Sequence, residues 1–149
     1  MTDTLNAAGI VAELRTLRTA GHVRGGAVDR GFETPEAAAR AFGLAGEPGL
    51  YGEIDASQAV SLLQRVIHRD LAYGVELVSP ARAQGLAIAF VQAAGGHGAR
   101  YFTNGTLGTA NASAAQGVSW SPATDATFDT GILVLMPQRS ACLWFEDED

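Results

Sequence analysis

The chain has 149 residues, the length of one ordinary domain, and is long enough to bury a sizeable core. Hydrophobic residues make up 47% of it and charged residues 17%, which excludes an intrinsically disordered chain. The formal net charge is −6, and all ten basic residues are arginine. This balance argues against nucleic acid as a direct partner, because phosphate contacts need clustered cations. It favours a basic partner, although mild acidity also serves solubility alone.

Cysteine content and hydropathy restrict the class of protein further. Cys142 is the only cysteine, which excludes an intramolecular disulfide and a cysteine-only metal site. Its apolar neighbours predict a buried core residue rather than a reactive thiol. The first ten residues lack the pattern of a secretory signal, and no apolar run approaches the roughly 20 residues that cross a bilayer. We therefore expect a cytoplasmic protein without a membrane partner or a cofactor.

Four segments have the apolar spacing and the boundary residues of helices. The third is the clearest, because Asp55 and Gln58 have the spacing of a capping box ahead of an apolar stripe. Thr34 and Ser79 are each followed by a proline, the usual order of an N-cap and a first helical residue. The predicted helices cover residues 4–20, 34–42, 55–72 and 79–95.

The last quarter of the chain, residues 126–149, is the stretch around which the rest is organised. Two apolar runs, 127–136 and 140–145, flank Pro137-Gln138-Arg139, which predicts a β-hairpin. Residues 132–136 are apolar without alternation, so this strand is expected to be buried on both faces at the centre of a sheet. Further strands are predicted at 100–103 and 118–121. Loops are predicted at 21–33, with or without a short strand, at 43–54, which could also be a linker, and at 104–117.

The order of these elements predicts an α+β fold. N-terminal helices are expected to pack on a C-terminal antiparallel sheet of about four strands. We expect a single domain over residues 1–149, with a helical subregion at 1–45 and a main body at 55–149.

The chain ends in Glu146, Asp147, Glu148 and Asp149, directly after the last apolar run. Unpaired carboxylates are almost never buried, so these acids are expected to form a compact negative patch at one edge of the molecule. The ordinary alternative is a solvated tail. The attachment to a core strand favours a patch, with Glu146 at least held in a fixed position. Asp125 is expected to extend it, and Trp120 and Tyr101 are candidates for an aromatic centre if they face outward.

Phe128-Asp129-Thr130-Gly131 matches the FDTG signature of aspartic proteases. Those enzymes need a flap and a further glycine-containing strand after the motif, and the 18 residues after Gly131 contain no glycine. A turn or strand entry is therefore the better interpretation of the motif. A small hydrolase or ligand-binding enzyme stays as an alternative if Asp129, His97 and the 104–117 loop converge on one cleft. None of the three histidines has a partner at a known metal-ligand spacing, so no metal site is predicted.

A resemblance to known proteins is carried by four segments: residues 62–73 (LLQRVIHRDLAY), 100–105 (RYFTNG), 127–131 (TFDTG) and 142–149 (CLWFEDED). These are similar to a family of small bacterial proteins of unassigned function. In type they resemble the immunity proteins encoded beside polymorphic, contact-dependent or type VI-delivered toxins. The resemblance covers roughly residues 55–149. It implies a non-enzymatic acidic domain that binds one cognate toxin, often a basic nuclease, and blocks its active or functional surface.

Overall fold

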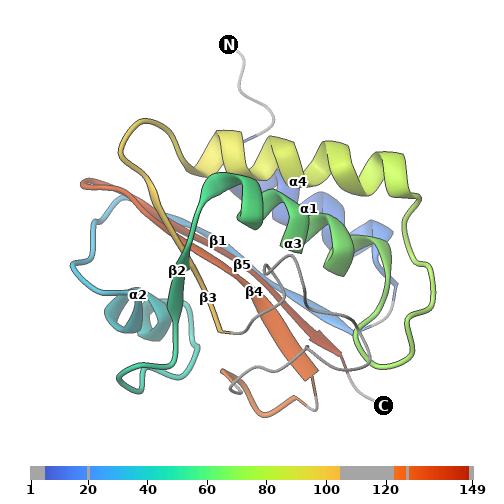
Figure 1. Cartoon of the computed structure of the whole chain (residues 1–149), viewed down its shortest axis with the longest axis horizontal. Helices are drawn as coiled ribbons and strands as arrows, with labels where there is room; N and C mark the ends of the chain where they lie inside the picture. Colours follow the sequence, from blue (N-terminus) through green and yellow to red (C-terminus); the bar gives the residue numbers. More distant parts are fainter. Residues whose placement is uncertain (1–5, 20, 105–122, 127, 148–149) are drawn as a thin grey trace.

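A computed structural model describes residues 6–19, 21–104, 123–126 and 128–147. These residues form four helices and a five-stranded antiparallel sheet (Figure 1). In chain order the elements are α1 (Ala7–Leu17), β1 (His22–Val28), α2 (Pro35–Ala41), β2 (Gly52–Ile54), α3 (Ala56–His68), α4 (Pro80–Ala94), β3 (Arg100–Thr103), β4 (Phe128–Leu135) and β5 (Ser140–Asp147). The α+β class is thus confirmed, and the strands alternate with the helices along the chain.

The strands lie in the order β1-β5-β4-β3-β2, so the predicted hairpin β4–β5 occupies the middle of the sheet. Its two strands pair from Phe128 opposite Asp147 to Leu135 opposite Ser140. The hairpin and the strand at Arg100–Thr103 are confirmed.

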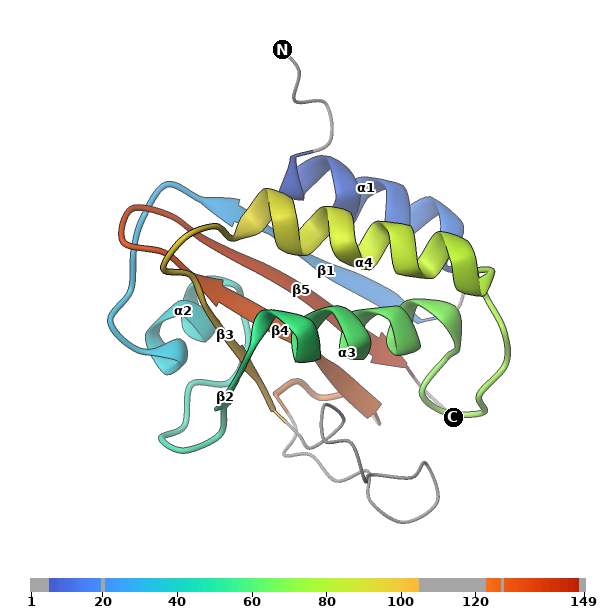
Figure 2. The same cartoon turned by 45° about the horizontal axis from the view of Figure 1, so that its top comes forward.

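Helices cover both faces of the sheet. Figures 1 and 2 show α1, α4 and α3 side by side over one face and α2 on the other. Ile132 and Val134 of β4 pack into the core beneath the three helices, whereas Leu133 packs into the smaller core beneath α2. Both faces of the central strand are therefore apolar, which confirms the prediction from its unalternating sequence.

The helix starts follow the local sequence. Asp55 Oδ1 accepts the Gln58 amide at 2.7 Å, and the Gln58 side chain accepts the Asp55 amide at 2.8 Å, which completes the predicted capping box. The side chains of Thr34 and Ser79 cap α2 and α4 ahead of a proline. The first helix begins after an N-cap at Asn6, and α3 ends at His68, four residues earlier than predicted.

Two segments predicted mainly as loops contain strands, the first of which had a short strand as an open alternative. Together with the three predicted strands that are described, they make the five strands of the sheet. β1 lies in the glycine-rich segment 21–33, and β2 lies in 43–54. A Cβ at Gly25 of β1 would lie 2.2 Å from the Cys142 carbonyl oxygen of β5, so the close approach of the two backbones requires glycine at this position. Glycine is also the residue that indicates a loop when the sequence is considered alone.

The sheet is therefore not formed by the C-terminal part of the chain alone, and β1 is one of its two edge strands. The predicted strand at 118–121 and all of the predicted loop beyond Asn104 lie outside the described residues. No helix in the described ranges is long and apolar enough to cross a membrane.

Candidate functional site

The two acids at the end of β5 lie on opposite faces of the sheet, because side chains alternate along a strand. Asp147 points toward the three-helix layer and is 2% exposed. Its carboxylate accepts two hydrogen bonds from the Arg18 guanidinium, at 2.7 and 2.6 Å, and one from the Leu71 amide at 2.6 Å. The prediction that Asp147 stays outside is wrong, because a bidentate cation partner allows a carboxylate to be buried.

Arg18 is fixed from several directions. Its Nε donates to the Val66 carbonyl at 3.1 Å, and its guanidinium lies 5.0 Å from the centre of the Phe145 ring. The Arg18–Asp147 pair therefore joins the residue after α1, the last turn of α3 and the end of β5. This position makes Asp147 part of the structural core rather than of a surface patch.

Glu146 faces the α2 side and remains reachable. Arg24 of β1 donates through Nε to Glu146 Oε2 at 2.8 Å, and the two side chains are 33% and 16% exposed. A Cβ at Gly43 would lie 2.8 Å from the Arg24 guanidinium, and Gly43 has a φ of +81°, so both space and backbone favour glycine there. The prediction that Glu146 is held in a fixed position is confirmed.

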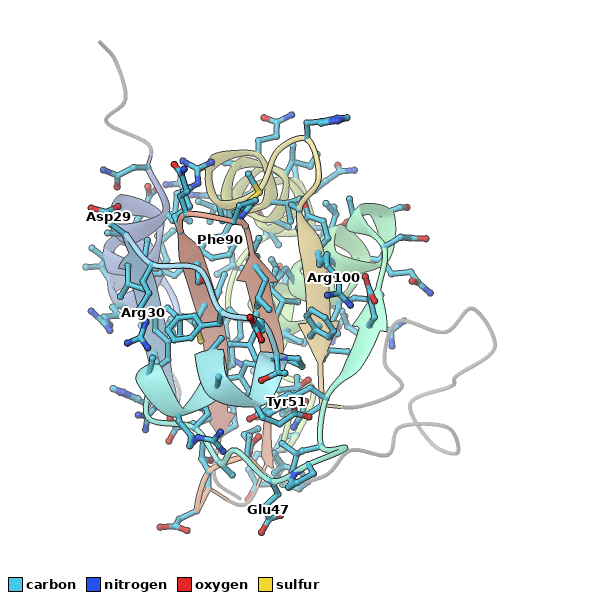
Figure 3. The ribbon with its side chains drawn as sticks, turned by 90° about the vertical axis from the view of Figure 1, so that its left-hand side faces the viewer. Asp29, Arg30, Glu47, Tyr51, Phe90 and Arg100 are labelled. Carbon is cyan, nitrogen blue, oxygen red and sulfur yellow. The ribbon has the colours of Figure 1, made fainter. Side chains whose placement is uncertain are left out.

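Glu146 and Arg24 form one wall of a polar hollow of about 640 Å³. Two further carboxylate side chains, Glu47 and Asp125, line the same hollow and are exposed. Figure 3 shows Glu47 at one end of the molecule, pointing away from the ribbon. Three carboxylates against one guanidinium make the lining negative. We call this site the acidic hollow; it is lined by Arg24, Gly43, Leu44, Ala45, Glu47, Ala123, Thr124, Asp125 and Glu146.

The turn that carries Asp125 is held by a buried carboxylate. Asp129 is fully enclosed and accepts hydrogen bonds from the Ala123 amide at 3.0 Å, the Thr124 hydroxyl at 3.0 Å and the Trp144 indole at 3.1 Å. The Ala45 amide donates to the Ala123 carbonyl at 2.8 Å. These bonds join opposite walls of the acidic hollow to each other and to the sheet, so its shape is set before anything binds.

The FDTG motif therefore has a structural role. Asp129 organises a turn, and a Cβ at Gly131 would lie 2.1 Å from the Leu143 carbonyl oxygen of the neighbouring strand. The other residue of the hydrolase alternative, His97, lies three positions before Arg100. Arg100 pairs with Leu135, at the opposite end of β4 from Asp129.

Asp129 pairs with Glu146 near the beginning of the same strand. At about 3.3 Å per residue, the two ends of β4 are roughly 20 Å apart. Asp129 therefore lies far from the end of β4 beside which the His97 segment enters β3, and the 105–117 part of the loop named with them lies outside the described residues.

The remaining predicted site residues divide into two groups. Trp120, Glu148 and Asp149 lie outside the described residues. Tyr101 is 7% exposed and packs in the core beneath the three helices, so it does not face the acidic hollow. In the part of the chain that the structure describes, no three His, Cys, Asp or Glu side chains are grouped as a metal site would require.

Arg24 and Glu47 were not predicted as site residues. Arg24 lies in a glycine-rich segment that reads as a loop, and its carboxylate partner is 122 positions away in the chain. Glu47 lies in the segment between α2 and β2, where the sequence offers only glycine and proline as local signals. The paired charges of Arg24 and Glu146 become visible only when β1 is placed beside β5.

No protein-family model, curated protein or solved structure matches the chain.

Proposed function

We propose that this protein is a non-enzymatic binding domain of the immunity type, which neutralises a cognate bacterial toxin by covering a cationic active or functional surface. The observation that carries the proposal is the acidic hollow. It places two exposed carboxylates, Glu47 and Asp125, beside a third, Glu146, whose position an arginine fixes. Such a lining is complementary to lysine or arginine side chains on a partner.

The mechanism of neutralisation is occlusion. Exposed carboxylates speed the encounter with a basic partner, because their field extends about 8 Å at physiological ionic strength. The rigid walls limit the entropy that would be lost on binding, since the 123–126 turn is already hydrogen-bonded to Asp129. A catalytic group is not required of such a protein.

The proposal is tested by affinity capture from cells that co-express the neighbouring open reading frame, at low and high salt. Wild type is compared with Glu47→Gln/Asp125→Asn/Glu146→Gln, which neutralises the acidic hollow. The matched control, Asp29→Asn/Glu33→Gln/Glu76→Gln, removes the same number of charges from exposed acids outside the hollow lining.

We expect a stoichiometric partner that the wild type and the control retain at low salt and that the hollow variant loses. Equal retention by the two variants would remove the acidic hollow from the binding surface. A wild-type bait that captures no partner, with the neighbour verifiably expressed, would contradict the immunity assignment.

A further inference from the structure

The hydroxyl of Tyr101 is the polar group that the fold leaves unexplained. Its ring packs in the core beneath the three helices, and the residue is 7% exposed. Among the described residues, every fully enclosed side-chain nitrogen or oxygen has a hydrogen-bond partner, whereas the Tyr101 hydroxyl has none. The hydroxyl must therefore keep contact with open space. A buried tyrosine normally gives its hydroxyl a partner.

That open space is a second hollow, of about 510 Å³, between the start of α3 and the end of α4. A Cβ at Gly95, the C-cap of α4, would lie 2.2 Å from the Tyr101 hydroxyl oxygen, which places the hydroxyl beside the last turn of that helix. We call this site the Tyr101 hollow; it is lined by Glu53, Ile54, Asp55, Ala56, Gln58, Gly96, Ala99 and Tyr101.

The Tyr101 hollow is independent of the acidic hollow. Tyr101 and Ile54 pair with each other across β3 and β2, next to Arg100, whereas Asp129 and Glu146 pair at the other end of the central strands. Tyr101 also belongs to the core on the three-helix face, whereas the acidic hollow opens on the α2 face. A ligand can therefore occupy either hollow without touching the other.

Two side-chain oxygens in the Tyr101 hollow can still accept hydrogen bonds. The Gln58 amide at the start of α3 already donates to Asp55 Oδ1, so Asp55 Oδ2 and the Tyr101 hydroxyl oxygen remain available. Glu53 accepts two hydrogen bonds from Arg100, at 3.2 and 3.0 Å, and this bonding lowers the pKa of Glu53 and keeps it charged. With Arg100 paired to Glu53, no cationic side chain among the residues that line the hollow pairs with Asp55.

An organic cation fits this set of groups. Its donors would match the free oxygens of Asp55 and Tyr101, and the carbonyl end of α4 offsets the positive end of α3 at the same hollow. Ile54, Ala56 and Ala99 give apolar walls that suit a methylene stem. No described group of three acids, histidines or cysteines can hold a metal ion, which favours an organic ligand over an inorganic one.

We infer that the Tyr101 hollow binds an alkylguanidinium or alkylammonium group, with Asp55 as the charge partner and the Tyr101 hydroxyl as the second acceptor. The group belongs either to a free amine or to an arginine or lysine side chain of another protein. This site does not depend on the proposed toxin-blocking role.

The test is a titration of the ¹⁵N-labelled full chain with agmatine, with the neutral analogue butylurea, which lacks both cationic groups of agmatine, and with the peptide acetyl-Gly-Arg-Gly-amide. We expect saturable shifts at the amides of 53–58 and 95–99 with agmatine or the peptide, and none with butylurea. Agmatine binding more tightly than the peptide identifies a free amine as the ligand, and the reverse order identifies a protein side chain.

Two conservative variants separate binding from folding. Tyr101→Phe removes only the unpartnered hydroxyl, and Asp55→Asn removes the charge but keeps a good N-cap. Each is expected to weaken binding about fivefold or more, in line with the loss of one charge-assisted hydrogen bond. Tyr51→Phe is the matched control, because its hydroxyl donates to the Ala45 carbonyl at 2.6 Å away from this hollow.

The inference is overturned if neither cationic probe gives saturable shifts, or if butylurea binds as well as agmatine. It is also overturned if Tyr101→Phe and Asp55→Asn, each folded by its ¹⁵N spectrum, bind with the wild-type affinity. A loss of affinity in Tyr51→Phe as large as in Tyr101→Phe would assign the effect to general loosening of the fold and would equally contradict the site.

Discussion

Glu146 and Asp147 are consecutive carboxylates at the end of β5, but their surroundings in the fold differ. Asp147 is enclosed, shares two hydrogen bonds with Arg18 and anchors the residue that follows α1. Glu146 is one residue earlier on the other face, and it is held by a single bond from the half-exposed Arg24. The first pair is buried structure, whereas the second borders a hollow that a partner can reach. Glu146 and Asp147 therefore do not form one patch, and the two carboxylates have different surroundings.

The difference also separates stability from binding. In a buried ion pair the attraction between the partners offsets the cost of removing both from water, and the loss of one partner leaves a desolvated charge. The Arg24–Glu146 pair is partly exposed, so water screens it and its expected contribution to the stability of the fold is smaller. Mutations on the two faces of β5 should therefore affect different measurements.

The largest effect is expected from Asp147→Ala, which removes the carboxylate that accepts two hydrogen bonds from the buried Arg18 guanidinium. The free energy of unfolding should fall by about 3–5 kcal/mol in a denaturant titration. The double variant Arg18→Met/Asp147→Leu removes both charges and should recover most of that loss. A single variant with a loss below about 1 kcal/mol would show that Asp147 is not the anchor of this region.

Asp129 gives the next largest effect, because it is buried among donors instead of being paired with a cation. Asp129→Asn keeps the shape but turns one end of the group into a donor, which then faces the amides of residues 123–124. We expect a loss of about 2–3 kcal/mol in the free energy of unfolding. The same substitution at the exposed Asp125 serves as control and should leave stability unchanged.

Glu146→Gln is expected to cost less than about 1 kcal/mol of stability, because its pair with Arg24 is partly exposed and screened. It should instead slow association with the basic partner and flatten the dependence of that rate on salt. Stopped-flow mixing at two salt concentrations measures both quantities. A loss of stability as large as that of Asp147→Ala would erase the distinction between the two faces.

The reactivity of Cys142 gives the smallest expected effect that still distinguishes Glu146 from Asp147. It is fully enclosed on the Glu146 face of the strand, and burial raises the pKa of its thiol. The thiol should react with a disulfide reagent only through opening of the fold. Glu146→Gln should leave the reaction rate near that of the wild type, whereas Asp147→Ala should raise it. Equal rates in the two variants would contradict the structural role of Asp147.

The hairpin, the helix caps and the class of fold could be predicted because their signals are local. Asp55 and Gln58 are three residues apart, and the unalternating run 132–135 indicates a central strand by itself. β1 could not be predicted in the same way. Its glycines satisfy a close contact with β5, a requirement that is visible only after the two strands are paired.

The candidate site was only partly predictable for the same reason. Asp125 and Glu146 were expected, but the fate of Asp147 depended on Arg18, which is 129 positions away in the chain. The FDTG motif is the opposite case, in which a group that can be catalytic is structural. The motif alone does not show that Asp129 is enclosed and bonded to backbone amides. In both cases the local sequence shows that a carboxylate is present, and contacts with residues distant in the sequence determine whether it is buried or exposed.

The most direct test of the central claim measures the association rate of the captured partner with two variants of equal net charge. One is Glu47→Gln/Asp125→Asn/Glu146→Gln in the acidic hollow, and the other is Asp29→Asn/Glu33→Gln/Glu76→Gln outside it. If the acidic hollow is the binding surface, the first variant associates about tenfold more slowly than the second at low salt. Equal rates for the two variants would mean that the partner senses only the overall charge, and would contradict the account.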